Sequence, residues 1–204
     1  MPRPRVNLLS VELIADAAIE LADSGETFGV NALARKLGVT PSSLYNHVDG
    51  KDAIIELMRA RLGARYLPEP VTGEWDDIVT GTIRSLRHLY AEHPLIVPLI
   101  VGKTITDPGV IGSYDRLATA LAAAGVPDDE VLAIVAIVDA YAIGFGLDLT
   151  SPDEIWRPGI PTETLGRLIA DAATGEERSD RAFEIGLEML VDSLRLRVER
   201  VSAS

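Results

Sequence analysis

Six consecutive residues hold a concentration of side chains that can form hydrogen bonds with a nucleic acid. The chain reads SSLYNH from Ser42 to His47, so hydroxyl, amide and imidazole groups come from five of six positions. Such groups can bond to base edges in the major groove or to phosphate oxygens. Lys51 follows four residues later and adds a positive charge suited to a phosphate.

Two short helices joined by a tight turn are predicted to position these groups. Residues 31–37 show helical periodicity, and Gly38 is suited to end that helix. Thr40 can cap the next helix, and Pro41 suits its first position, where the missing N–H costs nothing. This is the helix-turn-helix arrangement, whose second helix enters the major groove.

The second of these helices has one apolar side and one polar side. Leu44 and Val48 lie four residues apart and are predicted to face inward. Tyr45 and Asn46 then point outward with Ser42, and Ser43 and His47 flank them. A helix at about residues 10–23 precedes the pair, and another over 51–65 follows it.

The stretch VNALARKLGVTPSSLYNHVDGKDAI resembles the DNA-binding signature of the tetracycline repressor (TetR) family, over about residues 10–62. The resemblance implies that Tyr45 and Lys51 contact phosphates and that Asn31 reads a base. It also places Pro41, Ser42, Ser43 and His47 in or beside the groove. The sequence departs from the family where Val48 replaces an aromatic residue and where Gly29 and Gly50 replace polar ones, so weaker helix entries are expected.

Two other classes of protein remain as alternatives, an enzyme and a helix-turn-helix module that only associates with proteins. The chain has three histidines, and His88 and His93 are five residues apart, which puts them on different faces of a helix. It contains no HExxH, GxSxG or glycine-rich phosphate loop. We therefore expect no catalytic residue, metal site or cofactor.

Composition and charge point to a protein with two parts. The chain has 204 residues, no cysteine and a formal net charge of −12. Residues 1–66 balance 8 Lys and Arg against 8 Asp and Glu, whereas the remainder has 11 against 23. We expect a cytoplasmic protein, because no signal peptide is evident and the apolar runs are interrupted before they could span a membrane.

Helical periodicity continues through the rest of the chain, so the predicted fold class is all-α. A three-helix DNA-binding domain over residues 1–50 is joined by the helix at 51–65 to a helical ligand-binding and dimerisation domain over 66–204. In the second domain we expect helices at about 75–93, 95–105, 108–124, 128–149 and 180–200.

Two of these helices carry more apolar surface than one chain can cover. The segment 128–149 is apolar on all sides, and the last helix adds Ile185, Met189 and Leu196 beside its main apolar stripe. Surplus apolar surface on two helices predicts a homodimer held by a four-helix bundle. Two recognition helices related by a twofold axis would read a palindromic double-stranded DNA operator.

The resemblance also implies a small, largely apolar effector that releases the DNA. Asp139 is the sharpest candidate anchor, because it interrupts an apolar stripe and its carboxylate needs a partner. A structural pairing with Arg116, Lys103 or the partner subunit is the alternative. The candidate ligand-binding residues are Tyr90, Thr104, Tyr114, Leu117, Asp139 and Ile143.

Overall fold

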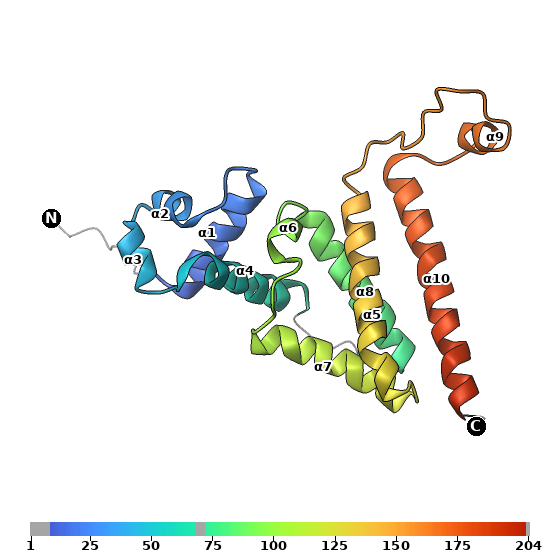
Figure 1. Cartoon of the computed structure of the whole chain (residues 1–204), viewed down its shortest axis with the longest axis horizontal. Helices are drawn as coiled ribbons and strands as arrows, with labels where there is room; N and C mark the ends of the chain where they lie inside the picture. Colours follow the sequence, from blue (N-terminus) through green and yellow to red (C-terminus); the bar gives the residue numbers. More distant parts are fainter. Residues whose placement is uncertain (1–8, 68–71, 203–204) are drawn as a thin grey trace. The chain divides into compact units, whose positions relative to one another are not determined.

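The computed structural model describes residues 9–67 and 72–202, and these residues form helices and no strand, which confirms the all-α prediction. Figure 1 shows the path of the chain. The described residues divide into two compact units, one of residues 9–67 with 95–113 and the other of 72–94 with 114–202. The domain boundary near residue 66 stays a prediction, because residues 95–113 pack with the first unit.

The first unit is built around the helix-turn-helix. Its helices are α1 (Val11–Asp23), α2 (Val30–Leu37), α3 (Pro41–Tyr45), α4 (Gly50–Tyr66) and α6 (Val97–Ile100), together with the start of α7 (Pro108–Ala123). The side chain of Ser10 accepts a hydrogen bond from the Leu13 N–H and caps α1 as predicted. Ile14, Leu33 and Leu44 are fully buried, so α1, α2 and α3 share one small core.

The helix expected over residues 95–105 is wrong in length, since only Val97–Ile100 is helical. Val101 is extended and Gly102 has a φ of 75°, so the chain turns away from the helix there. The Ile100 carbonyl accepts from the Lys103 N–H (3.2 Å) in a turn, and it and the Thr104 carbonyl also accept hydrogen bonds from Arg59 of α4. Apolar composition predicted a longer helix, but the backbone leaves the helical conformation at Val101 and Gly102.

The second unit packs α5 (Trp75–Glu92) against α8 (Asp128–Asp148), which lie side by side in Figure 1. The later part of α7, the short α9 (Thr164–Ala170) and the long α10 (Gly175–Ser202) complete it. Helix α10 begins at Gly175, five residues before the predicted start at residue 180. Its core joins Val79 and Ile83 of α5 with residues of the other long helices, namely Leu117, Leu121, Ile134, Val138, Phe183 and Leu187.

Close approach of α5 and α8 depends on one glycine. A Cβ atom added at Gly146 would lie 2.6 Å from the Cβ of Tyr90 and 3.1 Å from the carbonyl oxygen of Arg87. Any larger residue at this position would push the two helices apart.

The residues of α8 divide into a buried and an exposed side. Val131, Ile134, Val138 and Ala142 are buried, whereas Leu132 is 76% exposed and Ile137 is 50% exposed. Within the described residues α8 is long and apolar enough to cross a membrane by length and composition, although only 33% of that stretch is buried. The expectation that every apolar run is interrupted too early is therefore wrong for this helix.

Candidate nucleic-acid interface

The turn between α2 and α3 is formed by a glycine in the left-handed conformation. Gly38 has φ 67° and ψ 28°, a region that side chains with a Cβ rarely occupy. The N–H of Gly38 donates to the Arg35 carbonyl (3.2 Å) and that of Val39 to the Ala34 carbonyl (3.0 Å). These bonds satisfy the last carbonyl groups of α2 and aim the chain into α3.

The start and the buried side of α3 follow the prediction. The hydroxyl of Thr40 accepts a hydrogen bond from the Ser43 N–H at 3.2 Å, and Pro41 occupies the first turn. Leu44 is fully buried and Val48 is 6% exposed, so these two side chains attach the segment to the unit. Regular helix ends at Tyr45, and the Val48 N–H still bonds to the Leu44 carbonyl at 3.2 Å, which continues the turn.

The polar side of this segment faces away from the core. Tyr45 is 54% exposed, a large fraction for an aromatic residue that follows a fully buried leucine. Of the other predicted DNA contacts, Ser43 is half-buried and the rest are exposed: Asn31 in α2, Pro41 and Ser42 in α3, Asn46 and His47 in the turn, and Lys51 in α4. All eight belong to the first unit.

The entry to α4 explains one departure from the family pattern. Gly50 has a φ of 83°, so glycine suits the backbone at this position better than the usual polar residue. Neither Asp49 before α4 nor Gly29 before α2 supplies a side-chain cap. The ammonium of Lys51 lies 5.6 Å from the centre of the Phe28 ring, a cation–π contact that orients this predicted phosphate ligand.

Several basic side chains of the first unit are already paired. Arg61 forms two hydrogen bonds to Asp16 (2.7 and 2.9 Å), and Lys36 lies 3.0 Å from Glu20. In the described part of this unit, Arg35, Lys51 and Arg65 form no ion pair, and all three are exposed. The cations available to phosphates are therefore few.

A buried polar network joins α4 to the chain after α6. Arg59, 8% exposed, donates hydrogen bonds to the carboxylate of Glu56 (2.6 Å) and to the carbonyls of Ile100 (2.8 Å) and Thr104 (3.0 Å). The other oxygen of Glu56 accepts from the backbone N–H groups of Thr106 (2.5 Å) and Asp107 (2.7 Å). Sequence reasoning missed this network, because an arginine within a predicted helix gives no signal that it is buried.

The same network sets the charge state of Glu56. Burial raises the pKa of its carboxyl group, but the two backbone N–H groups and the Arg59 guanidinium outweigh that effect and hold the pKa below 4.5. Glu56 is thus an ionised acceptor that ties α4 to the segment before α7.

The candidate ligand-binding residues are only partly brought together. The hydroxyl of Tyr90 donates to the Asp139 carboxylate at 3.0 Å, between α5 and α8. Lys103 pairs with Asp52 (2.9 Å) and not with Asp139. Leu117 is fully buried in the core of the second unit, Tyr114 and Ile143 are half-buried, and Thr104 is exposed in the first unit.

A helix-turn-helix with an exposed polar second helix, in a chain with a second all-helical unit, defines the class of DNA-binding regulators. The family model described as "Tetracyclin repressor-like, C-terminal domain" matches residues 67–198. The chain belongs to the tetracycline repressor family of transcriptional regulators.

Relatives and solved structures agree with this assignment. The transcriptional repressor DrrR1 of Streptomyces coeruleorubidus is 24% identical, with coverage of 97% of this chain and 80% of that protein. A helix-turn-helix regulator of Saccharopolyspora erythraea is 31% identical over 74% of this chain and 63% of its own length. The structure of apo ActR from Streptomyces coelicolor shares the fold, with a TM-score of 0.76, 21% identity and coverage of 94% of this chain and 97% of that one.

Proposed function

We propose that the protein is a transcriptional repressor that binds a palindromic DNA operator as a homodimer and leaves it when a small effector binds. The observation that carries this proposal is the segment from Pro41 to His47, whose apolar side is buried and whose polar side is exposed. In this proposal residues 1–50 read the DNA, α4 transmits the change, and residues 66–204 bind the effector and the second subunit. A regulator of this kind acts in the cytoplasm, where bacterial DNA is found.

Gel shift with DNA fragments around the gene of this protein tests the reading segment. We expect Tyr45→Ala to weaken operator binding strongly, because the exposed ring and hydroxyl leave the interface. Trp156→Ala is the matched control, since Trp156 is equally exposed (53%) but lies in the second unit. Equal effects of the two variants, or no binding to any duplex, would favour a module for protein association.

A second pair of variants tests the phosphate contact. Lys51 lies in the first turn of α4 and Arg65 in its last turn, and neither forms an ion pair. Lys51→Ala is expected to reduce the slope of log affinity against log salt by about 1, as loss of one phosphate contact does. Arg65→Ala removes the same charge from the same helix and should leave that slope unchanged.

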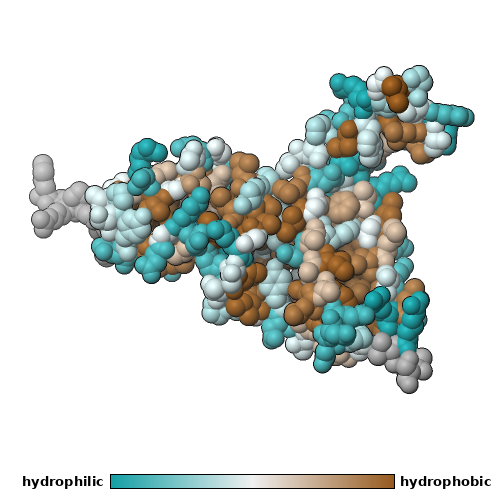
Figure 2. Space-filling model, in the orientation of Figure 1, coloured by the Kyte–Doolittle hydropathy of each residue, from teal (hydrophilic) through white to brown (hydrophobic). Residues whose placement is uncertain are grey.

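The proposed dimer rests on apolar surface that the chain leaves uncovered. On α8, Leu132 and Ile137 are exposed, and Figure 2 shows apolar residues gathered over this helix. On α10, Ile185, Met189 and Leu196 are 50%, 68% and 53% exposed. Burial of these side chains in a bundle shared by two subunits would remove an apolar surface that water solvates poorly.

Analytical ultracentrifugation tests whether the exposed apolar side chains of α8 form the dimer interface or are merely exposed to solvent. Leu132→Glu places a charge in the proposed interface and is expected to give a folded monomer. Ile160→Glu is the matched control, because Ile160 is equally exposed (73%) but lies in the connection between α8 and α9. A wild-type protein that sediments as a monomer at micromolar concentration would contradict the proposal.

The proposed effector site centres on Tyr90 and Asp139, a polar pair next to aliphatic side chains of α5 and α8. One solved structure with this fold is ActR in complex with actinorhodin, and the same kind of small-molecule site is proposed in this chain. Effectors found by thermal shift should release operator DNA. Asp139→Asn should weaken their binding and leave DNA affinity without effector unchanged.

A further inference from the structure

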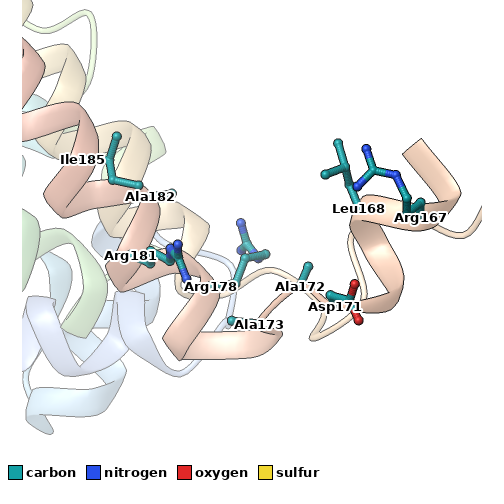
Figure 3. Close-up of a pocket in the computed structure, with 9 residues that line it drawn as sticks. All are labelled: Arg167, Leu168, Asp171, Ala172, Ala173, Arg178, Arg181, Ala182 and Ile185. Carbon is teal, nitrogen blue, oxygen red and sulfur yellow. The ribbon is translucent and has the colours of Figure 1, made fainter. Parts of the chain in front are cut away.

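A pocket lies between α9 and α10 in the second unit, and neither Tyr90 nor Asp139 of the proposed effector site lines it. Figure 3 shows this pocket, with Arg167 and Leu168 on α9 and Arg181 and Ile185 on α10. Its volume is about 370 Å³, at the lower end of the roughly 300–1,000 Å³ of known ligand pockets. The space is therefore sufficient for a small organic molecule.

The charge of the pocket is opposite to the charge of its surroundings. Beyond residue 66 the chain has 11 Lys and Arg against 23 Asp and Glu. Three of these basic residues, Arg167, Arg178 and Arg181, line this one pocket, with Asp171 as its single acidic residue. An excess of guanidinium groups in an acidic domain indicates a local preference for anions.

Two of the three guanidinium groups have no partner. Most arginines in the described part of the second unit form ion pairs with carboxylates, as Arg84, Arg87, Arg157, Arg178, Arg195 and Arg197 do. Arg116 and Arg200 have interactions as well. Arg167 and Arg181 are the two in these described residues that form no polar contact through the side chain, and both line the pocket.

Arg178 adds a further unmet donor at the wall of the pocket. Its Nη2 atom pairs with Asp148 at 2.9 Å, but its Nε atom is buried and has no acceptor. Asp148 compensates the charge of Arg178, and Asp171 is the single carboxylate against Arg167 and Arg181, so the pocket keeps a net positive charge that would attract an anion. The pocket thus presents hydrogen-bond donors that have no acceptor within the protein.

We propose that this pocket binds a small organic carboxylate with an apolar body. The planar guanidinium groups of Arg167 and Arg181 match the geometry of a carboxylate, to which arginine can donate two parallel hydrogen bonds. Leu168, Ala182 and Ile185 supply the apolar contacts for the rest of the molecule. This site is distinct from the proposed effector site, and its test does not depend on DNA binding.

Calorimetric titration of the full chain with 2-naphthoate tests the proposal, with 2-naphthamide as the uncharged analogue. We expect 2-naphthoate to bind in the wild-type protein at least tenfold more tightly than 2-naphthamide. The double variant Arg167→Gln and Arg181→Gln should weaken 2-naphthoate by about tenfold or more, because it removes two charged hydrogen-bond donors. Arg157→Gln is the control, since Arg157 is exposed and pairs only with the neighbouring Glu154. It should change the affinity less than twofold.

Three outcomes would overturn the assignment. The first is no measurable binding of 2-naphthoate, or equal binding by the double variant and the wild type. The second is inorganic phosphate binding as tightly as 2-naphthoate, which would show a bare cationic patch. The third concerns Ile185, which also lies on the exposed side of α10. If the double variant shifts only the monomer–dimer equilibrium in sedimentation, the pocket is occupied by the second copy.

Discussion

Replacement of Arg59 by methionine tests whether the network between α4 and the segment 100–107 stabilises the first unit. Methionine fills much of the same space but cannot donate to the carbonyls of Ile100 and Thr104 or to the carboxylate of Glu56. The variant leaves a partly buried carboxylate without its cation and removes the Arg59 donor from both carbonyl groups, of which that of Ile100 keeps the Lys103 N–H at 3.2 Å.

The expected loss follows from the burial and number of these contacts. Breaking a buried ion pair by removal of one partner costs about 3–5 kcal/mol. Two features lower this value: Thr104 is exposed, so water can reach its carbonyl, and Glu56 keeps the N–H groups of Thr106 and Asp107. We expect a loss of about 3 kcal/mol, which corresponds to a fall in Tm of roughly 6–12 °C for a chain of this size.

Thermal unfolding followed by circular dichroism, at one fixed protein concentration, measures this loss. Arg61→Met is the matched control, because Arg61 lies in the same helix and also forms an arginine–carboxylate pair, with Asp16. The Arg61 side chain is 41% exposed and that of Arg59 is 9% exposed, so the control pair is screened by water. Equal falls in Tm for the two variants would refute the argument from burial.

Three further predictions concern single positions. Glu56→Gln should make the stability of the fold less sensitive to acid. The pKa of the Glu56 carboxyl group is lowered in the folded protein, so its ionised form stabilises the fold at neutral pH. This contribution is lost as the pH falls below 4.5 and through the folded pKa. Urea unfolding at pH 7 and pH 3.5 should show a smaller pH difference in this variant than in the wild type. Gly50→Ala should cost about 1 kcal/mol, because φ is 83°, whereas Gly29→Ala, at an extended φ of −179° with open space around it, should show no such strain. Gly186→Ala should lower Tm, since its Cβ would lie 2.5 Å from the Tyr141 hydroxyl, and an unchanged Tm would mean that α8 and α10 can separate without cost.

The reading segment was predictable from the sequence because its determinants are local. Thr40, Pro41 and the left-handed Gly38 act within one or two turns, and Leu44 with Val48 defines the inner side. Local capping and helical periodicity also predicted the start of α7 and the extent of α8. It did not show that α3 ends at Tyr45, because the end of so short a helix depends on how the next helix packs.

Contacts between residues far apart in the chain could not be predicted in this way. Arg59 reaches carbonyls 41 and 45 residues away, and no local pattern in the sequence indicates this contact between α4 and the chain around the end of α6. Asp139 was recognised as a polar residue in an apolar stripe, but its partner, Tyr90, lies 49 residues earlier and became evident only from the packing of α5 on α8.

The sequence by itself determined the helix-turn-helix, its buried and exposed sides, and the all-α class, since capping, turn conformation and helical periodicity are properties of neighbouring residues. Only the tertiary structure decided which side of α8 is covered, because a helix that is apolar all round has no preferred face. It alone also brought Arg167 of α9 and Arg181 of α10 to one pocket. The unpaired charges there depend on which carboxylates lie within reach in three dimensions, and the order of residues does not specify that distance.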